Sequence, residues 1–168
     1  MADVTATGVV VAGVQAGQVR DVATVAAQLA ERFDVSLVCV TVDPALLQAG
    51  TRPDGSAIVE PIDPDTADAQ PHPLPAADVA TLQQIAATHG VPVEVLTRVG
   101  DPARALTNVA DERDAVLIVV GTQTGRRRIA EFFNGSVAAR LTHQQHRPVV
   151  VVPVDPVGFD EPLPWDPS

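Results

Sequence analysis

Lysine is absent from the sequence, and all eleven basic residues are arginines. A phosphate-loop lysine, a kinase-type ATP lysine and a Schiff-base lysine are therefore excluded. The single cysteine, Cys39, lies in an apolar run, so no disulfide framework or paired-cysteine metal site can form. We expect this thiol to be buried. Tyrosine is also absent and aromatic residues make up only 3% of the chain, so Val, Ala, Leu and Ile must build the core.

Long apolar runs and a positive net charge are missing as well. No run reaches the ~18 apolar residues that a membrane span needs. The first residues lack a basic segment followed by a long apolar stretch, so we expect no signal peptide and a cytoplasmic protein. The formal net charge of −10 repels phosphate backbones and anionic lipid surfaces. We therefore expect neither nucleic acid nor membrane as a partner.

Apolar runs alternate with amphipathic segments along most of the chain, which predicts an α/β fold. Helix 18–33, for example, places Val22, Ala26, Leu29 and Phe33 at helical spacing for its inner face. Alternating units favour parallel pairing with helices on both faces, so we predict an open, doubly wound, five-stranded parallel sheet, Rossmann-like, in one domain over residues 1–153. The predicted strands are 8–14, 35–42, 91–99, 115–120 and 149–152, and the predicted helices are 18–33, 76–89, 103–113 and 137–141.

Two segments lack this periodicity. Residues 44–75 are rich in Pro, Asp and Gly, and we predict a long, flexible, partly disordered loop. Residues 154–168 form a Pro-rich tail that cannot be helix or central strand. This tail is either exposed and disordered or an arm that packs Phe159 and Trp165 on the body or on a partner.

Glycines follow the strand 115–120 and form the main candidate binding feature. Gly121 and Gly125 come directly after the strand, and Gly135 with Ser136 precedes a short helix. Glycines allow backbone N–H groups to converge on a phosphate, and a helix N-terminus favours negative charge. Arg126 and the two arginines after it are the only dense positive charge. Taken alone, such glycines serve as ordinary turns more often than as phosphate sites.

The order of these motifs resembles the universal stress protein family over residues 8–153. The ATP-binding branch has Gly, two residues, Gly, nine residues, Gly, then Ser or Thr. Gly125, nine residues, Gly135 and Ser136 fit this pattern, whereas three residues separate Gly121 from Gly125. The further matches, in chain order, are GVVVAGV, VTVDP, VGDPARAL, DAVLIVVGT, GSVAARL and RPVVVVP.

The resemblance implies an adenine nucleotide, ATP or AMP, with or without Mg²⁺. Thr41, or its neighbour Val40, would border the adenine. Gln15 stands where the family usually has Asp, and an amide cannot make the charge-assisted bond that a carboxylate makes to a ribose hydroxyl. Arg126, Arg127 and Arg128 could compensate at the phosphates. The residues implied to hold or contact the phosphates are Gly121, Gly125, Gly135, Ser136 and Val137.

The resemblance also implies a homodimer formed by antiparallel pairing of Val149–Val152, and a role as a sensor or regulator of the stress response. No general base is evident beside the glycines, so any ATP hydrolysis would be slow, and no catalytic residue is predicted. Two alternatives stay open: a protein of the same fold that binds no nucleotide and acts through protein–protein contacts, and an adenine nucleotide hydrolase. His143 and His146 lie three residues apart but have no third ligand nearby, so we predict no metal site.

Overall fold

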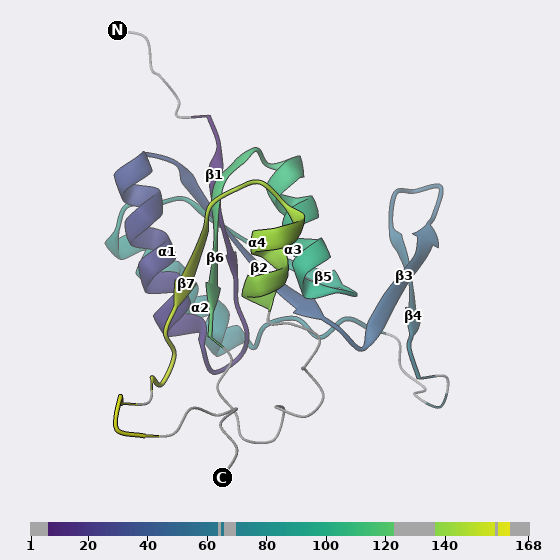
Figure 1. Ribbon diagram of the computed structural model, residues 1–168. Helices are drawn as coiled ribbons and strands as arrows, with labels where there is room; N and C mark the ends of the chain where they lie inside the picture. Colours follow the sequence, from purple (N-terminus) through teal and green to yellow (C-terminus); the bar gives the residue numbers. More distant parts are fainter. Residues whose placement is uncertain (1–6, 64, 66–69, 123–136, 157, 162–168) are drawn as a thin grey trace, which may run out of the picture.

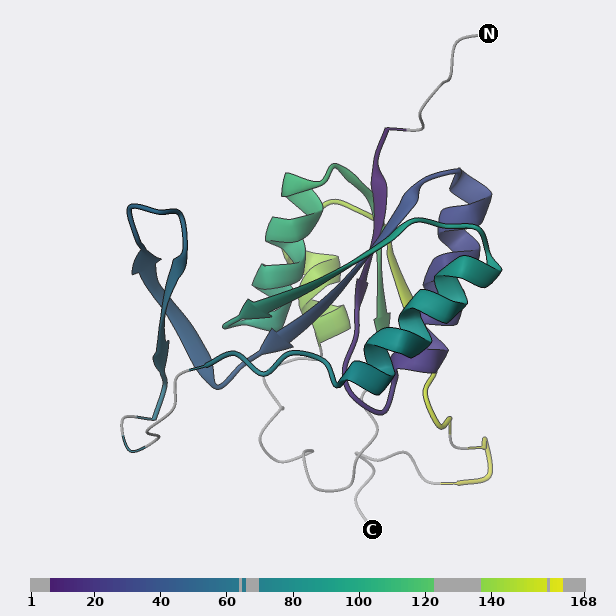
Figure 2. The same ribbon diagram turned by 180° about the vertical axis from the view of Figure 1, so that it is seen from behind.

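A computed structural model describes residues 7–63, 65, 70–122, 137–156 and 158–161. Its main sheet has five parallel strands in the order β5-β2-β1-β6-β7, which confirms the predicted α/β class. Helices α1 and α2 cover one face of the sheet and α3 and α4 the other (Figures 1 and 2). The elements are β1 (Val9–Gly13), α1 (Val19–Phe33), β2 (Ser36–Asp43), β3 (Leu46–Thr51), β4 (Ala57–Pro61), α2 (Ala76–Thr88), β5 (Val93–Val99), α3 (Pro102–Glu112), β6 (Ala115–Gly121), α4 (Val137–Gln144) and β7 (Val149–Val152).

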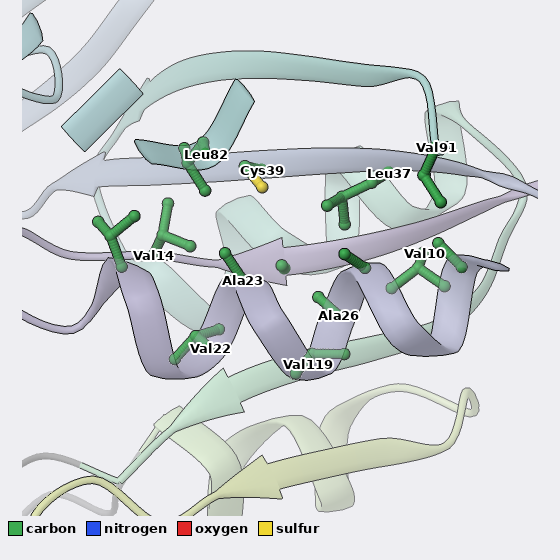
Figure 3. Close-up of a cluster of buried hydrophobic side chains, with 14 of the residues drawn as sticks. Val10, Val14, Val22, Ala23, Ala26, Leu37, Cys39, Leu82, Val91 and Val119 are labelled. Carbon is green, nitrogen blue, oxygen red and sulfur yellow. The ribbon is translucent and has the colours of Figure 1, made fainter. Parts of the chain in front are cut away.

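The central strands are buried on both faces, as their unbroken apolar sequences predict. Successive side chains of a strand point to opposite faces, so β1 supplies Val10 and Ala12 to the α1/α2 face and Val11 to the α3/α4 face. Figure 3 shows the first of these two cores, where Cys39 lies among valines and leucines. Burial raises the pKa of the Cys39 thiol to about 12, so this cysteine is a core residue as expected.

The last residue of helix α1 does not lie on the inner face that the sequence predicts for it. Phe33 is 51% exposed, so the prediction that it lies inward was wrong. The reason is local: Asp34 adopts a left-handed backbone, with φ of 55°, and its N–H bonds to the Ala30 and Glu31 carbonyls. This turn ends the helix at Phe33 and brings Val35 into the core in its place.

Helix α3 begins where the sequence predicts. The Asp101 side chain accepts a hydrogen bond from the Arg104 N–H, with 2.9 Å between the atoms, and Pro102 occupies the first turn. Gly90, with φ of 64°, follows the end of α2. Both boundaries are therefore encoded by a few neighbouring residues.

The segment 44–75 corrects the prediction of a long, flexible loop. Strands β3 and β4 form an antiparallel hairpin that projects from the main sheet (Figure 2). At its turn, the Arg52 N–H donates to the Ser56 carbonyl at 2.7 Å, Asp54 Oδ1 accepts from the Ser56 N–H at 2.9 Å, and Gly55 has φ of 86°. The Pro, Asp and Gly that indicated disorder are thus partly the residues of a tight turn.

The two ends of the segment 44–75 are joined through the buried carboxylate of Asp43. Asp43 Oδ1 accepts from the Ala45 N–H at 3.0 Å, and Asp43 Oδ2 lies 3.2 Å from the His72 backbone N and 2.7 Å from His72 Nδ1. Burial would raise the pKa of Asp43, but these bonds and the nearby imidazole hold it below its usual value. The His72 side chain itself is 86% exposed.

Strands β5 and β7 form the two edges of the main sheet. The four valines of β7 therefore lie at an edge, and Val151 is 43% exposed. Beyond β7, Phe159 is fully exposed, whereas Trp165 lies outside the described residues. None of the described helices combines the length and the apolar character that crossing a membrane requires.

Candidate functional site

A cavity of about 310 Å³ lies at the carboxyl ends of the parallel strands. Its wall includes Gly13 at the end of β1 and Gly121 at the end of β6. From β1 the chain crosses to β2 on one side, whereas β6 and β7 lie on the other, so the order of strands reverses here. Open parallel sheets bind ligands at such a position, and the volume is at the lower end of the range for small-molecule sites.

The deeper walls of the cavity are apolar. Val40 and Val42 come from β2, Leu106 from α3, and Val137 from the start of α4. Gly13 allows α3 to approach closely, because a Cβ atom there would lie only 2.9 Å from Leu106 Cδ1. The α3/α4 side of the sheet thus presents an apolar, uncharged surface to the cavity, as small-molecule sites usually do.

The open edge of the cavity carries amide and hydroxyl groups. Gln15 and Gln18 come from the turn between β1 and α1, and Thr122 follows β6. Gln18 Nε2 donates to the Thr122 carbonyl at 3.1 Å, which bridges this turn to β6. The exposed Gln15 side chain makes no hydrogen bond with any residue that the structure describes, so its amide is free to donate and accept.

Gly121 has a packing role in addition to its place in the wall. A Cβ atom there would lie 2.9 Å from Val22 Cγ2, 3.1 Å from Gln18 Oε1 and 3.2 Å from Val154 Cγ2. Glycine at this position therefore lets helix α1 and the chain after β7 close against the end of β6.

The predicted site residues fall into three groups. Gln15, Gly121 and Val137 line the same cavity. Thr41 is buried in β2 but is not part of the cavity lining, because strand alternation places it on the opposite face from Val40 and Val42. The predicted alternative, Val40, does line it. The other predicted residues, Gly125, Arg126, Gly135 and Ser136, lie outside the described residues.

Sequence reasoning missed Gln18, Val42 and Leu106. A signal for Gln18 was available, because the first turn between a strand and a helix borders the crevice in this class of fold. Val42 follows Val40 by two residues and so shares its face. Leu106 was predicted only as an inward residue of its helix, and nothing in the sequence separates cavity lining from core at that position.

None of the cavity-lining side chains that the structure describes carries a charge. Two carboxylates adjoin lining residues in the sequence: Asp43 follows Val42, and Asp101 precedes Pro102. Asp101 is already engaged by the Arg104 N–H and by the Arg140 guanidinium. Burial alone would raise the pKa of Asp101, but these two partners hold it below its usual value. The Asp101–Arg140 pair also ties the start of α3 to α4 beside the cavity.

A metal site is not found among the described residues, which contain no group of three His, Cys, Asp or Glu side chains suited to hold an ion. His143 and His146 are both exposed.

The amino-acid sequence matches a known protein family. The sequence model of the Universal stress protein family matches residues 8–153. A comparison with curated protein sequences gives no match.

Solved structures share the fold. A universal stress protein in complex with cAMP is 25% identical, with a TM-score of 0.58, over 88% of this chain and 97% of that chain. A universal stress family protein from Burkholderia pseudomallei is 21% identical, with a TM-score of 0.56, over 89% of this chain and 98% of that one. One from Archaeoglobus fulgidus in complex with dAMP is 19% identical, with a TM-score of 0.51, over 88% and 98%. Because the family model covers most of its length, the chain belongs to the universal stress protein family.

Proposed function

We propose that the cavity binds an adenine nucleotide, ATP or AMP, and that the protein acts as a sensor or regulator in a stress response. The observation that carries this proposal is the convergence of Gln15, Gly121 and Val137, three residues far apart in sequence, on one cavity at the strand-order reversal. The relative solved with cAMP, at 25% identity, supports an adenine nucleotide as the ligand class.

The residues present fit the base and sugar of such a ligand. The valines of β2 together with Leu106 offer an apolar surface for the purine, and the Gln15 amide can bond to a base or ribose edge. The lining lacks charge in the described part of the chain, so the phosphates would extend toward the residues after Thr122, where the sequence places Gly125 and Gly135. We propose no rapid hydrolysis, because no described lining residue is a general base.

The first test is to identify any nucleotide that co-purifies with the protein, followed by calorimetric titration with ATP, AMP and cAMP. Binding of at least one of them supports the proposal. Absence of binding at millimolar ligand would contradict it and would favour the alternative, a protein of the same fold that acts through protein–protein contacts.

A second test blocks the cavity. Val42→Trp adds a large ring to a half-buried position in the wall, and we expect it to abolish detectable nucleotide binding while the protein stays folded. Leu47→Trp is the matched control, because Leu47 is a half-exposed strand residue in the hairpin, outside the cavity lining. Equal affinity of the two variants would show that the nucleotide binds elsewhere.

We also propose that two copies pair through β7. This strand is wholly apolar, it lies at a sheet edge, and an uncovered apolar edge favours association with another strand. Sedimentation equilibrium of the purified protein should give the mass of a dimer, and a monomer at micromolar concentration would contradict this part of the proposal.

A further inference from the structure

The first turn of α4 forms one side of the cavity, through Val137 and Ala138. Both of these residues are only partly buried. All eight residues of α4 are described, and Leu141, one turn further on, is the one that is buried. The buried contact of α4 thus lies beyond the turn that borders the cavity, so the position of this turn depends on further contacts.

The neighbouring helix α3 borders the cavity through its first two turns (Figure 1). Pro102 and Leu106 line the cavity, and Asp101 directly precedes them as the N-cap of the helix. The two oxygens of the Asp101 carboxylate have separate partners. Oδ1 accepts from the Arg104 N–H at 2.9 Å, which starts α3, and Oδ2 accepts from the guanidinium of Arg140 on α4.

The Asp101–Arg140 ion pair connects the two helices at the turns that line the cavity. Arg140 follows Val137 by three residues, so these two residues lie on one side of α4. Asp101 adjoins the lining residue Pro102 on α3. The side chains of Arg140 and Asp101 are 34% and 32% exposed, so water screens their attraction less than that of a fully exposed pair.

We propose that the Asp101–Arg140 ion pair sets the separation of α3 and α4 beside the cavity and so positions the walls that hold the base of the bound nucleotide. Asp101 and Arg140 are positioning residues, because neither lines the cavity and each adjoins residues that do. This inference rests on the proposed nucleotide function. It concerns the base and ribose, so adenosine, which has neither phosphate nor charge, is the ligand that tests it.

The first measurement is the affinity for adenosine by calorimetric titration. Arg140→Met keeps an unbranched apolar stem and removes the charge, and Asp101→Asn keeps an acceptor for the Arg104 N–H. We expect each variant to lose about three- to fivefold in adenosine affinity, the effect of one partly exposed ion pair. The double variant should lose no more than either single variant, because both changes remove the same interaction. Arg140→Lys, which keeps the positive charge, should retain most of the affinity.

Arg113→Met is the matched control, because it removes an ion pair of similar exposure from the other end of α3. Arg113 Nη2 lies 2.8 Å from Glu94 Oε1 on β5, and the two side chains are 39% and 44% exposed. Neither residue lines the cavity. This variant should leave the adenosine affinity unchanged.

The second measurement is the dependence of adenosine affinity on salt. Raising the ionic strength from about 0.02 M to 0.5 M screens the ion pair but not the uncharged ligand, so the affinity of the unaltered protein should fall toward that of Arg140→Met. The affinity of Arg140→Met itself should change less over the same range. If α3 and α4 were held by apolar packing alone, the two proteins would show the same salt dependence.

The outcomes separate this inference from the proposed function. Losses no larger than that of Arg113→Met, additive losses in the double variant, or equal salt dependence of the two proteins would overturn the positioning role while nucleotide binding stands. Binding of AMP without measurable binding of adenosine would overturn the same role. Failure of the unaltered protein to bind adenosine, AMP, ATP or cAMP at millimolar concentration would overturn the proposed function and this inference with it.

Discussion

The two faces of the sheet are packed to different degrees. On the α1/α2 face, the fifteen-residue helix α1 carries four fully buried alanines and lies close against the strands. On the α3/α4 face, α4 has only eight residues, and the cavity opens between its first turn, α3 and the strand ends. The comparison indicates that one face provides most of the closed core, while the other leaves room for a ligand at one end.

The largest expected difference comes from the same truncation on each face. Leu82 on α2 is fully buried, and Leu106 on α3 is equally inaccessible but borders the cavity. We expect Leu82→Ala to lower the free energy of unfolding by about 3–5 kcal/mol, because it leaves a closed void. Leu106→Ala should cost about 2–3 kcal/mol, because the space joins an existing cavity that water can enter.

Urea unfolding of both variants measures this difference. A cost for Leu106→Ala as large as that for Leu82→Ala would show that the α3/α4 face is packed as tightly as the other.

The next comparison adds one methyl group on each face. Gly121→Ala places a Cβ among Val22, Gln18 and Val154 on the closed side, and the nearest of these, Val22, is a stiff β-branched residue. Gly13→Ala meets mainly the end of the Leu106 side chain, which can move toward the cavity. We expect a loss of about 1–3 kcal/mol for Gly121→Ala and below about 1 kcal/mol for Gly13→Ala.

Thermal unfolding distinguishes these glycine variants. Because neither glycine has a positive φ, backbone strain contributes to neither result. The reverse order of stability would contradict the assignment of Gly121 to the closed side.

The smallest expected effect concerns Asp101, which ties α3 to α4. Its pKa is lower in the folded protein than in the unfolded chain, so its stabilising contribution is present above the unfolded value and is lost as pH falls through the folded value. Asp101→Asn keeps a helix cap but removes the charge beside Arg140. We expect the variant to lose up to about 1 kcal/mol at pH 7.

The pH dependence provides the measurement. The difference in unfolding free energy between the unaltered protein and Asp101→Asn should begin to shrink as pH falls through the usual pKa of an aspartate, where the unfolded chain takes up the proton, and should be lost once pH has passed the lower pKa of the folded protein. Glu60→Gln, which removes an exposed carboxylate on β4, is the control for loss of one negative charge. A difference that stays constant down to pH 3 would contradict a contribution from the ionised Asp101 side chain.

Much of the fold was predictable because its signals are local. The apolar runs of β1, β2 and β6 require burial on both faces, and the Asp101-Pro102 pair marks the start of α3 within two residues. Phe33 was assigned to the wrong side because helical spacing does not show that the left-handed turn at Asp34 brings Val35, and not the last helical residue, into the core. The hairpin was missed because its composition resembles disorder, whereas its strands depend on turn bonds at Arg52 and Asp54.

The candidate site was only partly predictable, since it depends on which face each strand residue occupies. The sequence suggested Thr41 or Val40 without deciding between them, and the register of β2 places only Val40 in the lining. Gln18 lies 104 residues from its partner Thr122, and no short pattern reveals such a bond. The resemblance in the sequence named Gln15, Gly121 and Val137, which share the cavity lining, and only the three-dimensional packing adds Gln18, Val42 and Leu106 to it.

The segment 44–75, which contains the hairpin, begins directly after Asp43 and also returns to it. Asp43 accepts hydrogen bonds from the backbone N–H groups of both Ala45 and His72. A segment whose ends already meet adds little closure entropy when its length changes, about 0.6 kcal/mol for each doubling. This segment is therefore the natural place for the protein to vary in length over evolution, or to accept an inserted peptide. The sheet and the cavity would keep their geometry as long as Asp43 retains its two contacts.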